Sequence, residues 1–234
     1  MPAVPQDGDV ACAAGSFLER LPHAARRELL ALGVTRTVSA GRRLLTERAR
    51  DTHVEVIRQG FVKVTTAADG TERLLAIRLP GDLVGEFAAI TGQGRSATVT
   101  ACGDVVSTAI RQVDFLDFIS RHSAIAAQVA ATVGERLRWA NERRADFAAH
   151  PVRVRLARML AEIAVNCGRR EGDELVIEVE LSHTELATLI GAATDTTQRA
   201  LRTLRADHLI RTGYRRIVVL DLAGLQAVTT VEDD

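Results

Sequence analysis

The chain has 234 residues, 47% of them hydrophobic, so it can bury the cores of two modest domains. Its 30 basic and 30 acidic residues balance, which excludes a generally basic nucleic-acid binder and makes the local placement of charge the useful observation. No apolar run approaches the roughly 20 residues of a membrane span, and the first 16 residues lack a secretory pattern, so we expect a cytoplasmic protein without a membrane partner.

The first predicted elements are one or two short helices followed by a series of short strands. Apolar residues between Phe17 and Leu32 have helical spacing. From Val34 to Ile110 the hydrophobic pattern alternates, as in strands. The turns between them fall at Gly41, Gly60, Asp69-Gly70 and Pro80-Gly81. The Asp-Gly pair is the strongest hairpin signal, and many evenly spaced strands predict an antiparallel sandwich or roll.

The stretch from Gly81 to Ala101 contains residues suited to binding a nucleotide. Gly85 lets the backbone approach a ligand, and a short helix starting beside it would point free N–H groups at an anion. Arg95, expected on a surface loop, can hold two phosphate oxygens, and Ser96 can donate a third hydrogen bond. Glu86 fits beside a phosphate if it accepts a hydrogen bond from a sugar hydroxyl. Any one of these residues alone is typical of an ordinary turn or loop, so the interpretation depends on the whole pattern.

This stretch resembles the phosphate-binding cassette of the Crp-Fnr family and of cyclic nucleotide-binding domains generally. The resemblance rests on Gly81-Asp82, Gly85-Glu86 and Arg95-Ser96-Ala97, and it extends from about Phe17 to about Leu222. It implies a cyclic nucleotide, with cAMP as the first candidate, and these ligand-binding residues: Gly85, Glu86, Phe87, Arg95, Ser96, Ala97, Arg136 and Asn141.

One loop departs from the family pattern. Arg48 follows Glu47 at a position where the family usually has glycine. A positive φ strains residues other than glycine, so we expect the loop from Glu47 to Asp51 to take another shape.

A long helix is predicted next, within the helical pattern from Asp114 to Ala149. Its apolar stripe recurs at intervals of three, four or seven, at Ile125, Val129, Val133, Leu137, Ala140 and Phe147. A helix of about 28 residues with near-heptad spacing usually has a partner, and family members dimerise through this helix. The alternative is that the stripe packs only on the strand domain. His150-Pro151 should end the helix, and Pro151 suits the start of the next one at a domain hinge.

Asn141 and Arg136 of this helix are candidate contacts for the base of the ligand. In cAMP-responsive relatives a Thr and a small polar residue lie together where the base touches both subunits, whereas this chain has Ala140-Asn141. Asn141 still offers a donor and an acceptor, with Arg136 as a helper. With half of the contact missing, we expect weak coupling between ligand and DNA, and substantial DNA affinity without ligand.

A helix-turn-helix follows. Ser182-His183-Thr184-Glu185 forms a capping box that fixes a helix start, Gly191 supplies the turn, and a second helix runs through Leu204. The polar hairpin from Gly213 to Val219 is the expected wing. Ala193 cannot cap the second helix, a loss of about 1 kcal/mol unless Thr194 caps it one residue later.

The outer face of the second helix has the chemistry of a recognition helix. Arg199 can bind guanine, Asp195 can accept from cytosine and Gln198 can pair with adenine. The candidate DNA contacts, some to bases and some to phosphates, are Thr194, Asp195, Thr196, Gln198, Arg199, Arg202 and Arg205. A solvated helix face has a similar composition, but the capping box and the glycine turn favour DNA binding. Family members usually start this helix with Ser and then Arg or Pro, so the target sequence cannot be transferred.

We therefore predict an α+β protein in three parts. An antiparallel β-roll of the cyclic nucleotide-binding type covers residues 17–120, a long dimerisation helix 121–149 and a winged helix-turn-helix 151–224. The expected function is a homodimeric transcription regulator that binds double-stranded DNA under control of a cyclic nucleotide, with RNA polymerase as a candidate partner.

Alternative functions remain open. The chain could be a Crp-Fnr-type regulator with another effector or constitutive DNA binding, or a cyclic nucleotide-binding regulatory protein that does not bind DNA. An enzyme is disfavoured, because neither His183 with Glu185 nor Ser96 has partners at a recognised catalytic spacing. Cys12, Cys102 and Cys167 are too widely spaced for a disulfide framework or a Cys-x-x-Cys metal site, so no cofactor is expected.

Overall fold

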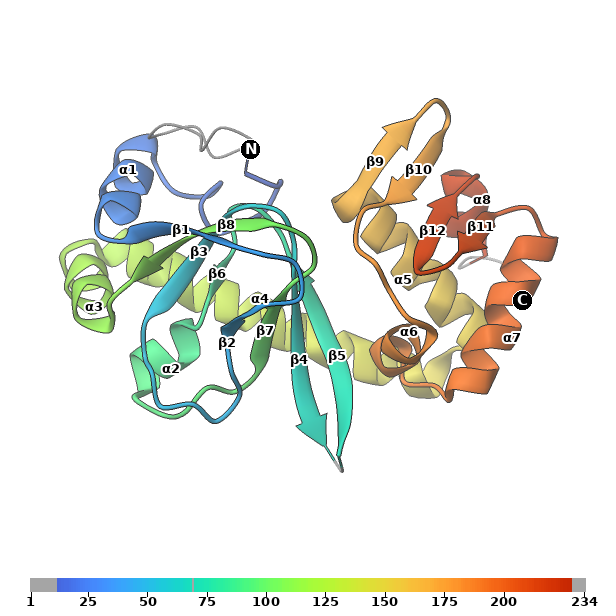
Figure 1. The fold of residues 1–234 in the computed structure, drawn as a ribbon, viewed down its shortest axis with the longest axis horizontal. Helices are drawn as coiled ribbons and strands as arrows, with labels where there is room; N and C mark the ends of the chain where they lie inside the picture. Colours follow the sequence, from blue (N-terminus) through green and yellow to red (C-terminus); the bar gives the residue numbers. More distant parts are fainter. Residues whose placement is uncertain (1–11, 69, 229–234) are drawn as a thin grey trace. The chain divides into compact units, whose positions relative to one another are not determined.

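The computed structural model describes residues 12–68 and 70–228, and the chain divides into two compact units, Met1–Arg136 and Leu137–Asp234. The first unit contains α1 (His23–Ala31), β1 (Val34–Val38), β2 (Arg43–Leu45), β3 (Val54–Gln59), β4 (Val62–Ala68), β5 (Thr71–Arg78), β6 (Leu83–Val84), α2 (Glu86–Thr91), β7 (Thr98–Ala101), β8 (Val105–Ile110), α3 (Gln112–Arg121) and the start of α4 (Ser123–Ala149). The second contains the end of α4, then α5 (Val152–Cys167), β9 (Gly168–Glu171), β10 (Glu174–Ile177), α6 (His183–Ile190), α7 (Thr194–Ala206), β11 (Ile210–Gly213), β12 (Arg216–Val219) and α8 (Leu222–Ala227). Figure 1 follows this order along the chain.

The strands of the first unit form an antiparallel roll, as the alternating pattern predicts. They build two four-stranded sheets, in the orders β1-β8-β3-β6 and β2-β7-β4-β5 (Figure 1). The predicted hairpin joins β4 to β5, with Ala68 opposite Thr71. Gly70 has a φ of 72°, which glycine adopts without strain, whereas Asp69 lies outside the described residues.

Two apolar clusters stabilise this unit. Inside the roll, strands of both sheets contribute buried side chains that include Leu45, Ile57, Val62, Val99 and Val105. The second cluster joins the amino-terminal segment, α1, α3 and α4 to the sheet through Phe17, Leu29, Phe115, Phe118 and Val129. Full burial of each such side chain stabilises the fold by about 1.5–3 kcal/mol.

The stripe on α4 has two different environments. Ile125 and Val129 are buried within the first unit, as the alternative interpretation of the stripe predicted. Leu137 is 63% exposed in the single chain, so this part of the stripe has its apolar surface in water. The helix has 27 residues and ends at Ala149, close to the predicted length and end. The two units divide inside α4, so the predicted functional boundaries at 17–120, 121–149 and 151–224 stay predictions.

The loop that follows β2 contradicts one expectation. Arg48 adopts a φ of 65°, so the turn keeps the left-handed conformation with an arginine in it. Its backbone N–H donates to the Arg95 carbonyl at 2.9 Å, and the Arg95 N–H donates to the Ala49 carbonyl at 2.9 Å. These two bonds fix the loop on the residues before β7 and offset the strain at Arg48.

Among the described residues, no helix is long and apolar enough to cross a membrane.

Candidate nucleotide and DNA sites

The predicted cassette contains a glycine that the structure requires. Gly85 has a φ of 85° and precedes α2, which starts at Glu86 as expected. A Cβ atom at Gly85 would lie 2.5 Å from Nη1 of Arg95, so a side chain there would displace the guanidinium. The glycine therefore serves both the turn and the close approach of Arg95.

Glu86 and Arg136, both predicted ligand contacts, bind each other. Glu86 is buried, and Nη1 of Arg136 donates to its Oε1 at 2.6 Å, while Nη2 donates to the Leu83 carbonyl at 2.7 Å. A second guanidinium, that of Arg78, interacts with this pair. Burial, and next the charge of Arg136, lower the pKa of Arg78 to about 10. Sequence reasoning missed Arg78, which stands in a strand outside the cassette motif. Two arginines, Arg78 and Arg136, and two carboxylates, Asp82 and Glu86, therefore interact electrostatically at the start of α2.

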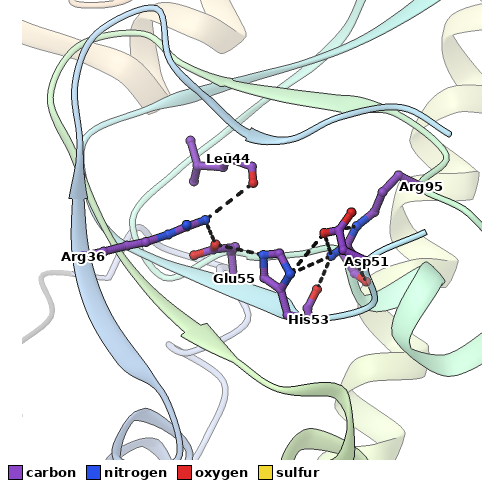
Figure 2. Close-up of polar contacts among 7 residues, drawn as sticks. Arg36, Leu44, Asp51, His53, Glu55 and Arg95 are labelled. Atoms are coloured by element: carbon purple, nitrogen blue, oxygen red, sulfur yellow. Dashed lines mark hydrogen bonds and ion pairs between the residues drawn. The ribbon is translucent and has the colours of Figure 1, made fainter. Parts of the chain in front are cut away.

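Arg95 is the largest departure from expectation, because its side chain is only 2% exposed and does not lie on the surface of a loop. Figure 2 shows its guanidinium facing Asp51 and His53. Nε and Nη2 approach Oδ2 of Asp51 at 3.2 and 2.7 Å. Nη2 also donates to the His53 carbonyl at 2.7 Å, and Nη1 to the Gly85 carbonyl at 3.1 Å. Arg95, which the sequence predicts to bind the phosphate, is thus hydrogen-bonded to groups of the protein itself.

The contacts of Arg95 continue into a buried polar chain. In Figure 2 the His53 ring lies between Asp51 on one side and Glu55 on the other. Its Nδ1 is 3.1 Å from Oδ2 of Asp51, and its Nε2 is 3.2 Å from Oε1 of Glu55. Glu55 is fully buried and also binds the guanidinium of Arg36. Burial opposes the charge on Asp51, but Arg95 outweighs that effect and lowers the pKa of Asp51 below its ordinary value.

Sequence reasoning missed Asp51, His53 and Glu55, although a signal existed. The three residues are spaced two apart along the chain that leads into β3, and this spacing places them on one side of an extended chain. Of the other predicted contacts, Phe87 and Ser96 are exposed and Ala97 is half-buried. Asn141 is exposed on α4 within the second unit.

The helix-turn-helix forms from the predicted signals. Ser182 caps α6, its Oγ accepting from the Glu185 N–H at 3.2 Å while the Glu185 carboxylate accepts from the Ser182 N–H at 2.8 Å. Gly191 ends α6 with a φ of 63°. A Cβ there would come within 2.6 Å of the Phe147 ring, so the turn needs glycine for its conformation and for space.

The second helix, α7, starts without a side-chain cap. Ala193 occupies the N-cap position, and Thr194 is the first helical residue, so Thr194 does not take over the cap. Because alanine has no polar side chain, the N-cap residue offers no side-chain acceptor to the first N–H groups of α7. The hydroxyl of Thr197 donates to the Ala193 carbonyl at 3.0 Å.

The two faces of α7 are divided as predicted. The inward face is buried at Thr197, Ala200, Leu201 and Leu204. On the outward face, Asp195, Arg199, Arg202 and Arg205 are exposed, and Thr194, Thr196 and Gln198 are half-buried. Arg205 donates to the Thr212 hydroxyl at 3.3 Å. Over residues 12–68 and 70–228, the guanidinium groups of Arg199 and Arg202 have no ion pair and no hydrogen bond.

The hairpin of β11 and β12 forms the predicted wing. Tyr214 at its tip is 93% exposed, and Arg215 beside it has a φ of 51°. Arg211 binds Glu174 at 2.7 Å, while Arg216 lies 3.7 Å from Glu171. Nearby carboxylates thus partly neutralise the arginines of the wing, whereas Arg199 and Arg202 of α7 have no such ion pair among the described residues.

Comparison with known proteins agrees with both parts. Residues 35–122 match the cyclic nucleotide-binding domain, and residues 154–228 match the Crp-like helix-turn-helix domain. The chain is 31% identical to the transcriptional regulator LdrP of Thermus thermophilus, over 73% of this chain and 84% of the relative. It is 29% identical to the CRP-like cAMP-activated global transcriptional regulator of Mycobacterium tuberculosis, over 71% of this chain and 75% of the relative.

A solved structure has the same fold. The c-di-GMP responsive global regulator CLP of Xanthomonas campestris superposes with a TM-score of 0.73 over 86% of this chain and 100% of its own, at 17% identity. The matched domains, their order and the two relatives place this chain in the Crp-Fnr family of transcription regulators.

Proposed function

We propose that this protein is a homodimeric regulator that binds a two-fold-symmetric DNA site and responds to a cyclic nucleotide, with cAMP as the first candidate. The observation that carries the DNA-binding role is the pair Arg199 and Arg202, exposed on α7, whose guanidinium groups have no partner among the described residues. A guanidinium with free donors can bind guanine or phosphate without first losing an internal bond. DNA as partner also supports the expected cytoplasmic location, and RNA polymerase stays a candidate partner.

The nucleotide-binding role rests on Gly85, Glu86, Arg95 and Arg136, which gather at the start of α2. The mycobacterial relative is cAMP-activated, which supports cAMP, whereas the Xanthomonas regulator is responsive to c-di-GMP. The choice of cAMP therefore belongs to the proposal.

Dimerisation rests on α4. Its Leu137 is largely exposed in one chain, at the expected position of an apolar stripe between two helices. A second copy of α4 would cover it and bring two α7 helices to half-sites about one helical turn apart.

A second candidate is a Crp-Fnr regulator that uses another effector or binds DNA constitutively. The contacts of Arg95 with Asp51 and His53 favour it, because they stabilise the ligand-free form of the cassette. Constitutive DNA binding also agrees with the substantial DNA affinity that we expect without ligand.

DNA selection from a random pool, followed by gel shift, tests these functions. We expect one symmetric site whose affinity changes with cAMP. Enrichment with no response to cAMP or cGMP would favour the second candidate. Selection with Arg199→Ala gives the matched background. If the wild type enriches no sequence above that background, the DNA-binding role is wrong.

The base contact has its own test. Asn141→Ala should remove most of the effect of cAMP on DNA affinity while changing cAMP affinity modestly, because Asn141 is expected to touch only the base. Operator affinity is measured with and without saturating cAMP in both proteins. A large ligand effect that survives in the variant would remove Asn141 from the site.

A further inference from the structure

Asp51 occupies the edge of Arg95 that would bind a phosphate. The two N–H groups on one edge of a guanidinium, Nε and one Nη, form the fork that binds two oxygens of an anion. In this protein both point at Oδ2 of Asp51, at 3.2 and 2.7 Å (Figure 2). Nη1 donates to the Gly85 carbonyl and Nη2 to the His53 carbonyl, and Nη2 also lies 3.2 Å from Nδ1 of His53.

The backbone fixes this pairing. Arg48 and Ala49 exchange two hydrogen bonds with the backbone of Arg95, each of 2.9 Å. The left-handed turn at Arg48 lies within the same loop, and Asp51 follows three residues later. His53 also contacts the carboxylate, with Nδ1 3.1 Å from Oδ2. The position of Asp51 is therefore built into the loop.

Asp51 can leave this position, whereas Arg95 cannot. The side chain of Asp51 is 42% exposed, so its carboxylate can rotate into water. The side chain of Arg95 is 2% exposed and anchored by two backbone carbonyl groups. An incoming anion would thus find the guanidinium in place and a carboxylate to displace.

From these contacts we infer that Asp51 is an internal competitor for the phosphate of the ligand, and that it sets the affinity of the cassette for cyclic nucleotides. Carboxylate and phosphate use the same fork, so they bind Arg95 in alternation. The inference rests on the proposed nucleotide site and adds a residue that lowers affinity without contacting the bound ligand.

The test compares cyclic nucleotide binding in five proteins by calorimetry with cAMP and with cGMP. Asp51→Ser removes the competing carboxylate, and we expect it to bind the nucleotide about tenfold more tightly than the wild type, because the ligand no longer has to displace the hydrogen bonds from Nε and Nη2 to Asp51. Asp51→Asn should gain less, because its amide oxygen still reaches the fork. Arg95→Ala should not bind.

Asp104→Asn is the matched control. Asp104 is an exposed carboxylate of the same roll that accepts from the Ala40 N–H, so the variant makes the same charge change away from Arg95. We expect its affinity to equal that of the wild type. An equal gain in Asp104→Asn and Asp51→Ser would overturn the inference in favour of a general charge effect. Thermal melting first establishes that each variant is folded, and Asp51→Asn gives the answer if Asp51→Ser is not.

The outcomes separate the inference from the proposed function. If the wild type binds, Arg95→Ala does not, and both Asp51 variants match or fall below the wild type, Asp51 is no competitor and the nucleotide site stands. If only the Asp51 variants bind, the competition is strong enough to keep the natural protein ligand-free. If neither the wild type nor any Asp51 variant binds either nucleotide, the inference and the nucleotide role both fail.

Discussion

The arginines of the cassette and those of the recognition helix differ in what they already bind. Arg95 and Arg136 are bound to carboxylates and backbone carbonyl groups of their own unit. Arg199 and Arg202 on α7 are exposed and, within the part of the chain that the structure describes, their guanidinium groups have no polar partner. The same side chain therefore contributes to the fold in one region and remains available for a partner molecule in the other.

This difference has an energetic consequence. Burying a guanidinium costs free energy unless the group is paired. When a paired, buried guanidinium is removed, its partners are left unsatisfied and the stability of the fold falls. An exposed, unpaired guanidinium contributes little to folding, and its removal is felt only when the partner binds. Stability and binding measurements on matched variants can separate the two roles.

The largest expected effect is on stability. Arg95→Ala should lower the free energy of unfolding by about 2–3 kcal/mol, because it removes a buried side chain and its hydrogen bonds to Asp51 and to the carbonyl groups of Gly85 and His53. Urea unfolding measures it, with Arg199→Ala as the control, expected within about 0.5 kcal/mol of the wild type. Equal stability of the two variants would mean that the contacts of Arg95 add nothing to the fold.

The next effect is on DNA affinity. Arg199→Ala should weaken binding to the selected site by about 1–3 kcal/mol and relax the preference at one base pair, because a bidentate base contact is lost. Arg205→Ala should weaken all sequences similarly and reduce the salt slope by about 1. Binding to randomised sites at several salt concentrations measures both. Equal losses on every sequence for the two variants would assign base reading to neither.

A smaller effect concerns the helix that supports the recognition helix. Ser182→Ala should lower the free energy of unfolding by about 1 kcal/mol, because it removes the side-chain acceptor of the capping box. Denaturant unfolding of the full chain measures it. Ser182→Asp, which preserves an acceptor, should retain most of the stability, and a loss as large as that of alanine would contradict the role of the cap.

The smallest expected effect is a gain. Ala193→Ser should stabilise the protein by about 0.5–1 kcal/mol, because a hydroxyl at the N-cap of α7 can accept from an N–H group that now lacks a side-chain acceptor. Thermal unfolding measures it, and Ala192→Ser one position earlier is the control. If DNA affinity also rises, the start of α7 limits recognition as well as stability.

Local signals in the sequence determined much of this protein. The capping box at Ser182 and Glu185, the turn at Gly191 and the hairpin of β4 and β5 depend on residues only a few positions apart. The same holds for Gly85 before α2 and for the two faces of α7. Such elements can be read from a sequence because their hydrogen bonds and side-chain periodicity are local.

Tertiary structure alone decided how Arg95 is used. The bond between Arg95 and Asp51 joins residues 44 positions apart, and it forms because the loop after β2 lies against the residues before β7. The same contact holds Arg48 in a left-handed conformation that local preference disfavours. A motif can identify an arginine suited to a phosphate, but whether its donors are free depends on carboxylates and carbonyl groups that only folding brings within hydrogen-bonding distance.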